Sequence, residues 1–146
     1  MPELLQICGM NSITVSTLTK LSILDAWNAW TNPEHIIHWT FASDDWHSPI
    51  ANSNLNEGGR FLTRMEAKDG SEGFDFEGTF TLVSSPNKLE YKLDDNRKVS
   101  VVFEEVSGGT RITETFDPEN INPAELQKAG WQAILDNYKK YADGLA

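Results

Sequence analysis

The C-terminal stretch NPAELQKAGWQAILDNYKKYADGL, residues 122–145, limits the folds open to the rest of the chain. Asn122 and Pro123 are typical of a helix start, because Asn caps free backbone N–H groups and Pro is favoured at the first helical position. Beyond them, apolar residues recur at helical spacing, with charged and amide side chains on the opposite side. The apolar side comprises Leu126, Gly130, Ile134, Tyr138, Tyr141 and Leu145, flanked by Trp131 and Leu135. The stretch predicts one long amphipathic helix.

The middle of the chain alternates apolar and polar side chains along five successive segments. Such period-two alternation is typical of strands with one apolar and one wet face, and the short turns between the segments favour hairpins. The expected strands cover residues 61–66, 74–82, 89–94, 99–104 and 111–116. A helix of about 23 residues spans ~34 Å, comparable with the ~30 Å of a nine-residue strand, so the C-terminal helix can cover this sheet.

The N-terminal part of the chain predicts one more strand and two short helices. Residues 13–18 are rich in β-branched side chains, which favour a strand. Ser22 is a typical helix cap and predicts a first short helix. Asn32-Pro33 repeats the signal and predicts a second one, which ends near Trp39.

Residues 46–55 leave two alternatives open, a poorly formed edge strand or a covering loop, because they contain Pro49 and little alternation. The pattern as a whole predicts an α+β fold. Its curved antiparallel sheet has six to seven strands around the long C-terminal helix, and two short helices follow the first strand. We expect residues 11–146 to form a single domain and residues 1–10 to be a flexible leader.

The composition narrows the classes of function. Twelve Lys and Arg face 22 Asp and Glu, which gives a net charge of −10, and such a chain repels nucleic acid and anionic lipid. No apolar run reaches the ~18 residues of a membrane span, and the start lacks the features of a signal peptide, so we expect a cytoplasmic protein without membrane insertion. Cys8 is the only cysteine, which excludes an internal disulfide and a cysteine-based zinc site.

A sheet that curls around one helix touches it along a line, and the space beside that line holds either side chains or a ligand. The side chains expected to face inward are rich in aromatic rings: Phe61, Met65, Phe74, Phe76, Phe80, Tyr91 and Phe103 from the sheet, and Trp131 and Tyr138 from the helix. Aromatic stripes are compatible with a solid core as well as with a pocket wall. Periodicity alone leaves both interpretations open.

Five short motifs point to a known family when they are taken together in their order. They are AWNAWTNPEHIIHW at residues 26–39, ASDDW at 42–46, GGRF at 58–61, FEGT at 76–79 and GWQAIL at 130–135. The set resembles proteins similar to the C-terminal domain of the activator of Hsp90 ATPase, within the START-like, Bet v 1-like superfamily that is also called SRPBCC. The resemblance spans nearly all of residues 11–145, and it implies the helix-grip fold of that superfamily.

The resemblance implies a cavity between sheet and helix that takes a small hydrophobic molecule, such as a lipid, a polyketide or an aromatic compound. We expect no cofactor. The ligand-binding candidates are Trp39, Phe61, Met65, Phe76, Phe80, Tyr91, Phe103, Glu114, Trp131, Ile134 and Tyr138. Glu114 is the expected polar anchor, because strict alternation between Ile112 and Phe116 turns it inward. A carboxyl group placed among aromatic rings should be paired, hydrogen-bonded or raised in pKa.

Two further functions remain open at this stage. An enzyme of the cyclase, dehydratase or hydrolase kind needs acid and base groups at the cavity, for which Glu114, His38, Asp45 and His47 are the candidates. An interaction protein, either an Hsp90-type co-chaperone or a stress-response protein, is the other alternative, and a homodimer is conceivable. His35, His38 and His47 lie near two aspartates in the sequence, but they match no metal motif and we expect no metal.

Overall fold

The computed structural model describes residues 11–146, and the expected leader at residues 1–10 lies outside the described residues. Its elements are β1 (Ile13–Thr19), α2 (Ile23–Thr31), α3 (Pro33–Ile36), β2 (Trp46–Ser53), β3 (Arg60–Ala67), β4 (Gly73–Ser84), β5 (Lys88–Leu93), β6 (Lys98–Val106), β7 (Gly109–Phe116) and α4 (Ala124–Leu145). The strands form one sheet in the order β1-β7-β6-β5-β4-β3-β2, and all neighbours are antiparallel.

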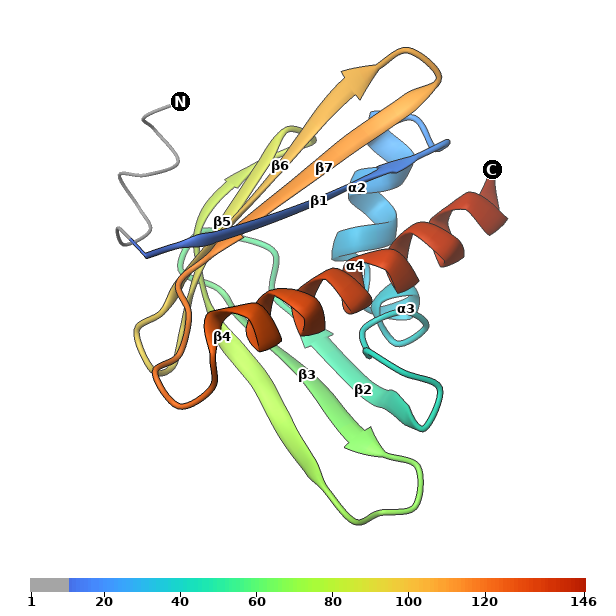
Figure 1. Cartoon of the computed structure of the whole chain (residues 1–146). Coiled ribbons are helices and arrows are strands. Elements are labelled where there is room, and N and C mark those ends of the chain that lie inside the picture. Colours follow the sequence, from blue (N-terminus) through green and yellow to red (C-terminus); the bar gives the residue numbers. More distant parts are fainter. Residues whose placement is uncertain (1–10) are drawn as a thin grey trace.

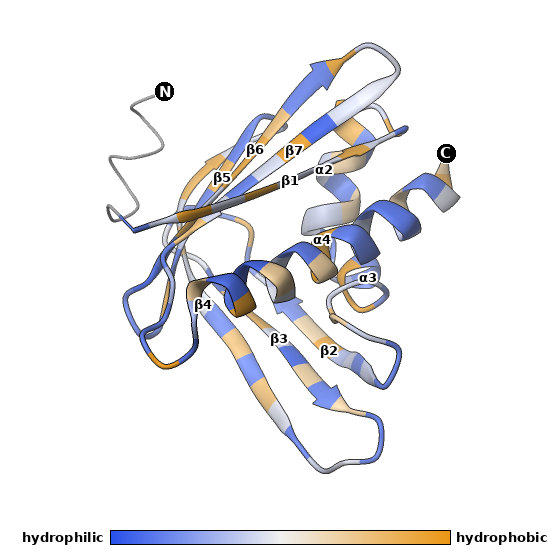
Figure 2. Cartoon of the chain, viewed as in Figure 1, coloured by the Kyte–Doolittle hydropathy of each residue, from blue (hydrophilic) through white to orange (hydrophobic). Residues whose placement is uncertain are grey.

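The long helix α4 crosses the inner face of the curled sheet, and the short helices α2 and α3 lie beside its C-terminal half (Figure 1). Apolar and polar residues alternate in bands along β3 and β4 (Figure 2), which is the pattern expected when only one face is covered. The predicted α+β helix-grip fold is confirmed. Across residues 11–146, no helix combines the length and apolar character needed to cross a membrane.

The structure settles the open alternatives for residues 46–55 in favour of an edge strand. β2 pairs with β3 from Trp46, opposite Ala67, to Ser53, opposite Phe61. The register shifts between His47 and Ile50, so Pro49 falls in an irregularity of the ladder. Proline lacks the N–H that a regular ladder needs, and an edge strand can tolerate it there.

The two short helices begin where the sequence predicts. The Ser22 hydroxyl accepts a hydrogen bond from the backbone N–H of Asp25 (3.3 Å), and the Asn32 side chain accepts one from the N–H of Glu34 (3.0 Å). The expected end of the second helix near Trp39 is wrong, because α3 stops at Ile36. Trp39 turns into the core instead, where its indole N–H donates to the Ala29 carbonyl (2.9 Å).

The predicted Asn122 cap of the long helix is also wrong. α4 begins at Ala124, and its cap position is occupied by Pro123 without a side-chain hydrogen bond. The Asn122 amide instead donates to the carboxylate of Glu119 (2.7 Å), which also accepts from the Asn122 backbone N–H. Buried Gln127 completes this loop, since its amide donates to the carbonyls of Glu119 and Asn122.

The buried side of α4 is rotated relative to the predicted one. Its fully or largely buried residues are Gln127, Leu135, Tyr138 and Ala142. Leu126, which the sequence places on the apolar side, is 60% exposed, and Leu145 is also exposed. Because buried Gln127 faces the loop before the helix, the neighbouring Leu126 points to solvent.

One extra residue in β4 reverses the expected direction of its last side chains. The ladder runs from Phe80 opposite Tyr91 to Leu82 opposite Glu90, so Thr81 forms a bulge. Leu82, which strict alternation predicts to face inward, shares the side of Glu90. Val83 takes the inner position and packs against the core.

A solid aromatic cluster fills the interior beneath the C-terminal half of α4. The ring of Trp30 lies 4.8 Å from Trp39 and 4.9 Å from Tyr138, while Trp39 lies 4.9 Å from Tyr138. Trp30 also meets Phe103 of β6 edge-on at 5.9 Å. The Tyr138 hydroxyl donates to the Ala26 carbonyl of α2 (2.7 Å), so this cluster joins α2, α4 and the sheet.

Asp143 anchors the end of α4 to the end of β1. Its carboxylate accepts hydrogen bonds from the Thr19 hydroxyl and the Lys20 N–H, both at 2.8 Å, and pairs with Lys139 at 2.7 Å. Partial burial acts to raise the pKa of Asp143, but these hydrogen bonds outweigh it and lower the pKa to about 2. The Asp143 carboxylate is therefore ionised at neutral pH.

Replacing Tyr138 by Phe removes the buried hydroxyl without opening a cavity, and we expect a loss of ~1 kcal/mol in the free energy of unfolding. Tyr141→Phe is the matched control, because the hydroxyl of the more exposed Tyr141 is hydrogen-bonded to His35 (2.6 Å) and its loss should stay within ~0.5 kcal/mol. Urea denaturation of both variants measures the difference. Equal losses would contradict the assigned role of the Tyr138 bond.

Candidate functional site

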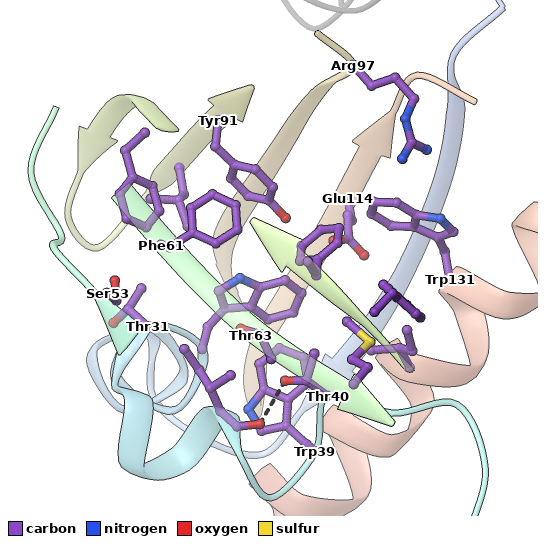
Figure 3. Close-up of a pocket in the computed structure, with 18 of the residues that line it drawn as sticks. Thr31, Trp39, Thr40, Ser53, Phe61, Thr63, Tyr91, Arg97, Glu114 and Trp131 are labelled. Atoms are coloured by element: carbon purple, nitrogen blue, oxygen red, sulfur yellow. Dashed lines mark hydrogen bonds between the residues drawn. The ribbon is translucent and has the colours of Figure 1, made fainter. Parts of the chain in front are cut away.

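A cavity of about 330 Å³ lies between the inner face of the sheet and the N-terminal half of α4 (Figure 3). This volume is far above the roughly 15 Å³ that one water needs. Its walls are formed by Trp30, Thr31, Ile36, Trp39, Thr40, Asn52, Ser53, Phe61, Thr63, Met65, Phe74, Phe76, Phe80, Leu89, Tyr91, Arg97, Glu114, Glu119, Gln127, Trp131 and Ile134.

The N-terminal half of α4 lines the cavity, whereas its C-terminal half packs in the core. Gln127, Trp131 and Ile134 from its first half face the cavity. Leu135 and Tyr138, from the middle of the helix onward, are fully buried in the hydrophobic core. A straight helix cannot follow a curled sheet along its whole length, so close packing at one end leaves the other end open.

Phe61 organises the sheet side of the cavity. Its ring lies 4.9 Å from Tyr91, 5.1 Å from Phe80 and 5.9 Å from Phe76. Phe61 is paired across the ladder with Gly78, where a Cβ atom would lie 2.4 Å from the Lys92 carbonyl oxygen and 3.0 Å from the Phe61 ring. Glycine at position 78 therefore leaves the space that this ring occupies.

Trp131 forms the helix side of the cavity. Its indole stacks on Phe116 of β7, with ring centroids 3.9 Å apart and planes 7° from parallel. Phe76 of β4 meets the same indole edge-on at 6.0 Å. These two contacts hold the Trp131 side chain between the helix and two strands, so that side of the cavity is pre-formed.

Glu114 is the acidic group buried deepest in this apolar wall. It lies on the inner face of β7 opposite Val15 of β1 and Val101 of β6, both buried. The residue is 6% exposed, and within residues 11–146 its carboxyl group has no hydrogen bond and no ion pair. Burial raises the pKa of Glu114 to about 8, so the group is mostly protonated at neutral pH.

The Tyr91 hydroxyl is another polar group in the cavity wall. Figure 3 shows Glu114 between Tyr91 and Trp131 in that view. Burial raises the pKa of Tyr91 well above its ordinary value, and the charge of Glu114 raises it further. Tyr91 is therefore a neutral hydrogen-bonding group at any pH of interest.

Charged and amide side chains gather at one edge of the cavity. Arg97 donates from Nε to the Asp95 carboxylate (2.8 Å), and Glu119 is fastened by the backbone and side chain of Asn122. Hydrogen bonds from Asn122 and the charge of Arg97 help to lower the pKa of Glu119. This edge of the cavity therefore carries one positive group, Arg97, and one negative group, Glu119, and each is hydrogen-bonded to a neighbouring residue.

The structure brings most of the expected ligand-binding residues to one cavity, although their role in binding stays a prediction. The expected residues that do line it are Trp39, Phe61, Met65, Phe76, Phe80, Tyr91, Glu114, Trp131 and Ile134. Phe103 and Tyr138 do not line it, because both are buried inside the solid cluster, of which Trp30 and Trp39 reach the cavity wall. Phe74, also expected to face inward, reaches the cavity edge but is 49% exposed.

Of the four acid and base candidates, the structure brings Glu114 alone to the cavity. His38 stacks on Tyr141 at 5.5 Å outside it, and His47 contacts Glu66 at 3.2 Å on the sheet. Asp45 accepts a hydrogen bond from Ser43 in an exposed turn. Within residues 11–146, no three His, Cys, Asp or Glu side chains converge to hold a metal ion.

Several lining residues were missed from the sequence. Thr63 could have been found, because it alternates with Phe61 and Met65 on the inner face of β3. Arg97, Glu119 and Gln127 come from a turn, a loop and a helix end, where no periodicity indicates direction. The other missed residues are Trp30, Thr31, Ile36, Thr40, Asn52, Ser53 and Leu89.

Comparison with known proteins places the chain among close structural relatives. Residues 20–143 match the family model described as activator of Hsp90 ATPase homolog 1-like protein. The solution structure of the AHSA1-like protein from Aeromonas hydrophila is 45% identical over 92% of this chain and 93% of its own, with a TM-score of 0.87. A protein from Cytophaga hutchinsonii is also 45% identical, over 92% and 94%, with a TM-score of 0.79. No curated protein matches the sequence.

A more distant structure, from Nitrosomonas europaea, is 18% identical over 92% of this chain and 95% of its own. Its TM-score is 0.78, which shows that the fold is shared at low sequence identity.

The buried Glu114 carboxyl should make stability depend on pH in a defined direction. With a pKa near 8 in the folded chain and near its ordinary 4.5 when unfolded, folding takes up a proton between these values. This group's contribution to stability is therefore lost as pH rises from about 5 to 8, by up to ~1.4 kcal/mol per pH unit. Glu114→Gln removes that loss, so we expect the variant to gain a few kcal/mol relative to the wild type over this interval.

Urea denaturation of both proteins at pH 5, 6.5 and 8 measures this difference. Glu105→Gln, at an exposed position of β6, is the matched control and should keep the wild-type pH profile. Parallel profiles for Glu114→Gln and the wild type would show that the folded chain keeps Glu114 ionised.

Proposed function

The chain belongs to the activator of Hsp90 ATPase homolog 1-like family, and on that premise we propose that it binds a small hydrophobic molecule between the sheet and α4. The observation that carries the proposal is an open volume of about 330 Å³ in the position where a solid core would otherwise lie. Ligand sites commonly measure about 300–1,000 Å³. The cavity is therefore of a size to hold a small organic molecule.

The cavity wall has the chemistry expected of such a site. Aromatic and aliphatic side chains form the larger share of it, and they come from β3, β4, β5 and α4 and from the segment of α2 and α3. Hydroxyl, amide and charged side chains make up the remainder. A site of this kind takes its affinity from apolar burial and its orientation from isolated polar groups. Glu114 and Tyr91 are placed to serve as those groups.

Apolar burial sets the scale of the affinity. Removing ~300 Å² of ligand surface from water at ~25 cal/mol per Å² contributes a gross ~7 kcal/mol. That corresponds to a Kd near ~10 µM before any ordering of the ligand or of side chains. The fixed position of Trp131, stacked on Phe116, keeps one such ordering cost small.

Binding is the function that this site supports better than catalysis. Acid and base catalysis needs at least two groups that converge on one reacting centre, and three of the four candidates lie away from the cavity. A homodimer and an Hsp90-type partner stay predictions from the family resemblance.

We expect the purified protein to bind N-phenyl-1-naphthylamine, a neutral aromatic probe that fluoresces in apolar surroundings, with a Kd of tens of micromolar. Ile134→Trp adds bulk to the cavity wall and should weaken this binding at least tenfold. Lys128→Trp places the same indole on the exposed side of α4 and should leave the Kd unchanged.

Native mass spectrometry with organic extraction of the purified protein tests for a resident ligand. A small molecule released on extraction would support the proposal. An empty protein that neither binds the probe nor is stabilised by a panel of lipids and aromatic compounds in thermal shift would count against it.

A further inference from the structure

We propose that the cavity is specific for a hydrophobic cation, an amine whose ammonium group pairs with Glu114 while its apolar part lies against the aromatic wall. The inference rests on the proposed function and specifies the class of ligand. It starts from the buried carboxyl group of Glu114, which lines the cavity.

Glu114 occupies a position that a purely structural core would fill with an apolar side chain. Its neighbours at every second position of β7, Ile112 and Phe116, are fully buried, and its cross-strand partners are Val15 and Val101. A buried carboxyl group is costly unless it is paired. Within residues 11–146 it has no hydrogen bond or ion pair, while its side chain faces an open cavity. A ligand that enters this cavity can supply a partner for the carboxyl group.

The charges around the cavity favour a cation over an anion. The titratable and charged groups that share its wall with Glu114 are Tyr91 from β5, Arg97 from the turn before β6 and Glu119 from the loop before α4. Arg97 is engaged by Asp95 at 2.8 Å and lies in the field of Glu119, so its positive charge is offset at the cavity edge. The net charge of −10 draws cations toward the protein as a whole.

The aromatic wall suits the same class of ligand. Faces of Trp, Tyr and Phe rings attract a cation within about 6 Å, and the attraction is strongest where water is excluded. Trp131 and Tyr91 flank Glu114 in Figure 3, and Phe76 meets both rings at 6.0 and 6.3 Å. A neutral ligand would use these rings but would bring no positive charge to pair with the carboxylate.

The pairing predicts a signature in pH. Burial keeps Glu114 protonated below about pH 8, so a bound ammonium must displace that proton. The affinity for an amine should therefore fall about tenfold per pH unit below pH 8, while the amine itself stays charged up to about pH 10. A neutral ligand of the same shape should show no such fall.

Three probes with one apolar part test the proposal: 4-phenylbutylamine, 4-phenyl-1-butanol and 4-phenylbutyric acid. Isothermal titration calorimetry at pH 8 should give the amine at least tenfold tighter binding than the alcohol, and no detectable binding of the acid. Lowering the pH to 6 should weaken the amine by up to a hundredfold and leave the alcohol unchanged. In Glu114→Gln, the amine should bind no more tightly than the alcohol, and the alcohol should bind as it does to the wild type. Glu105→Gln should bind all three probes as the wild type does.

The outcomes separate this inference from the proposed function. If the alcohol binds as tightly as the amine, the inference is overturned and hydrophobic binding stands. If none of the three probes binds and N-phenyl-1-naphthylamine does not bind either, both the amine specificity and the proposed hydrophobic binding are overturned. Circular dichroism checks that Glu114→Gln is folded, and if it is not, the pH dependence of the wild type decides between amine and alcohol.

Discussion

The contact between Trp30, Trp39 and Tyr138 is the interaction on which the rest of the structure depends. It joins α2, the turn after α3 and the C-terminal half of α4 in one solid cluster above β6. The Asp143 anchor to β1 holds the same end of the helix. With α4 seated there, its N-terminal half extends over a sheet that curls away from it. The cavity is the geometric consequence of this one-sided attachment.

Two sets of contacts hold the N-terminal half of α4 in place beside the cavity. The Phe116–Trp131 stack connects α4 to β7, and the Gln127 amide holds the loop before the helix by bonding to its carbonyls. Neither contact fills the space between Trp131 and Phe61. The protein thus keeps a volume free of side chains without leaving the helix end loose. A wall that is rigid before binding lowers the ordering cost of binding.

Glu114 shows where stability and the proposed function compete. A carboxyl group between Val15 and Val101 lowers the stability of the folded chain at any pH where it would otherwise be ionised. An apolar residue at that position would remove the cost and would also remove the acidic group from the cavity. Because the chain keeps the carboxyl group and directs it into an open volume, we interpret it as part of a binding site.

Several sequence-based expectations were wrong at positions where the local sequence does not indicate what a side chain faces or contacts. The bulge at Thr81 reverses the facing of Leu82 and Val83, although the sequence there alternates without interruption. Asn122 has the composition of a cap, yet Glu119 engages its side chain. Phe103 and Tyr138 are aromatic and face inward like the residues of the cavity, but they lie at the closed end. Each outcome depends on neighbours that are distant along the chain.

The sequence by itself determined the order of elements, the inner face of most strands and the inward direction of Glu114, because period-two and helical spacing are properties of the local backbone. The tertiary structure alone decided where along α4 the interior is filled and where it is open. Where the interior is open depends on the distance between the curled sheet and the straight helix at each point along α4. The periodicity of the sequence does not indicate that distance. The division between filled and open interior separates Tyr138, which holds the fold together, from Trp131, which lines the space that a ligand would enter.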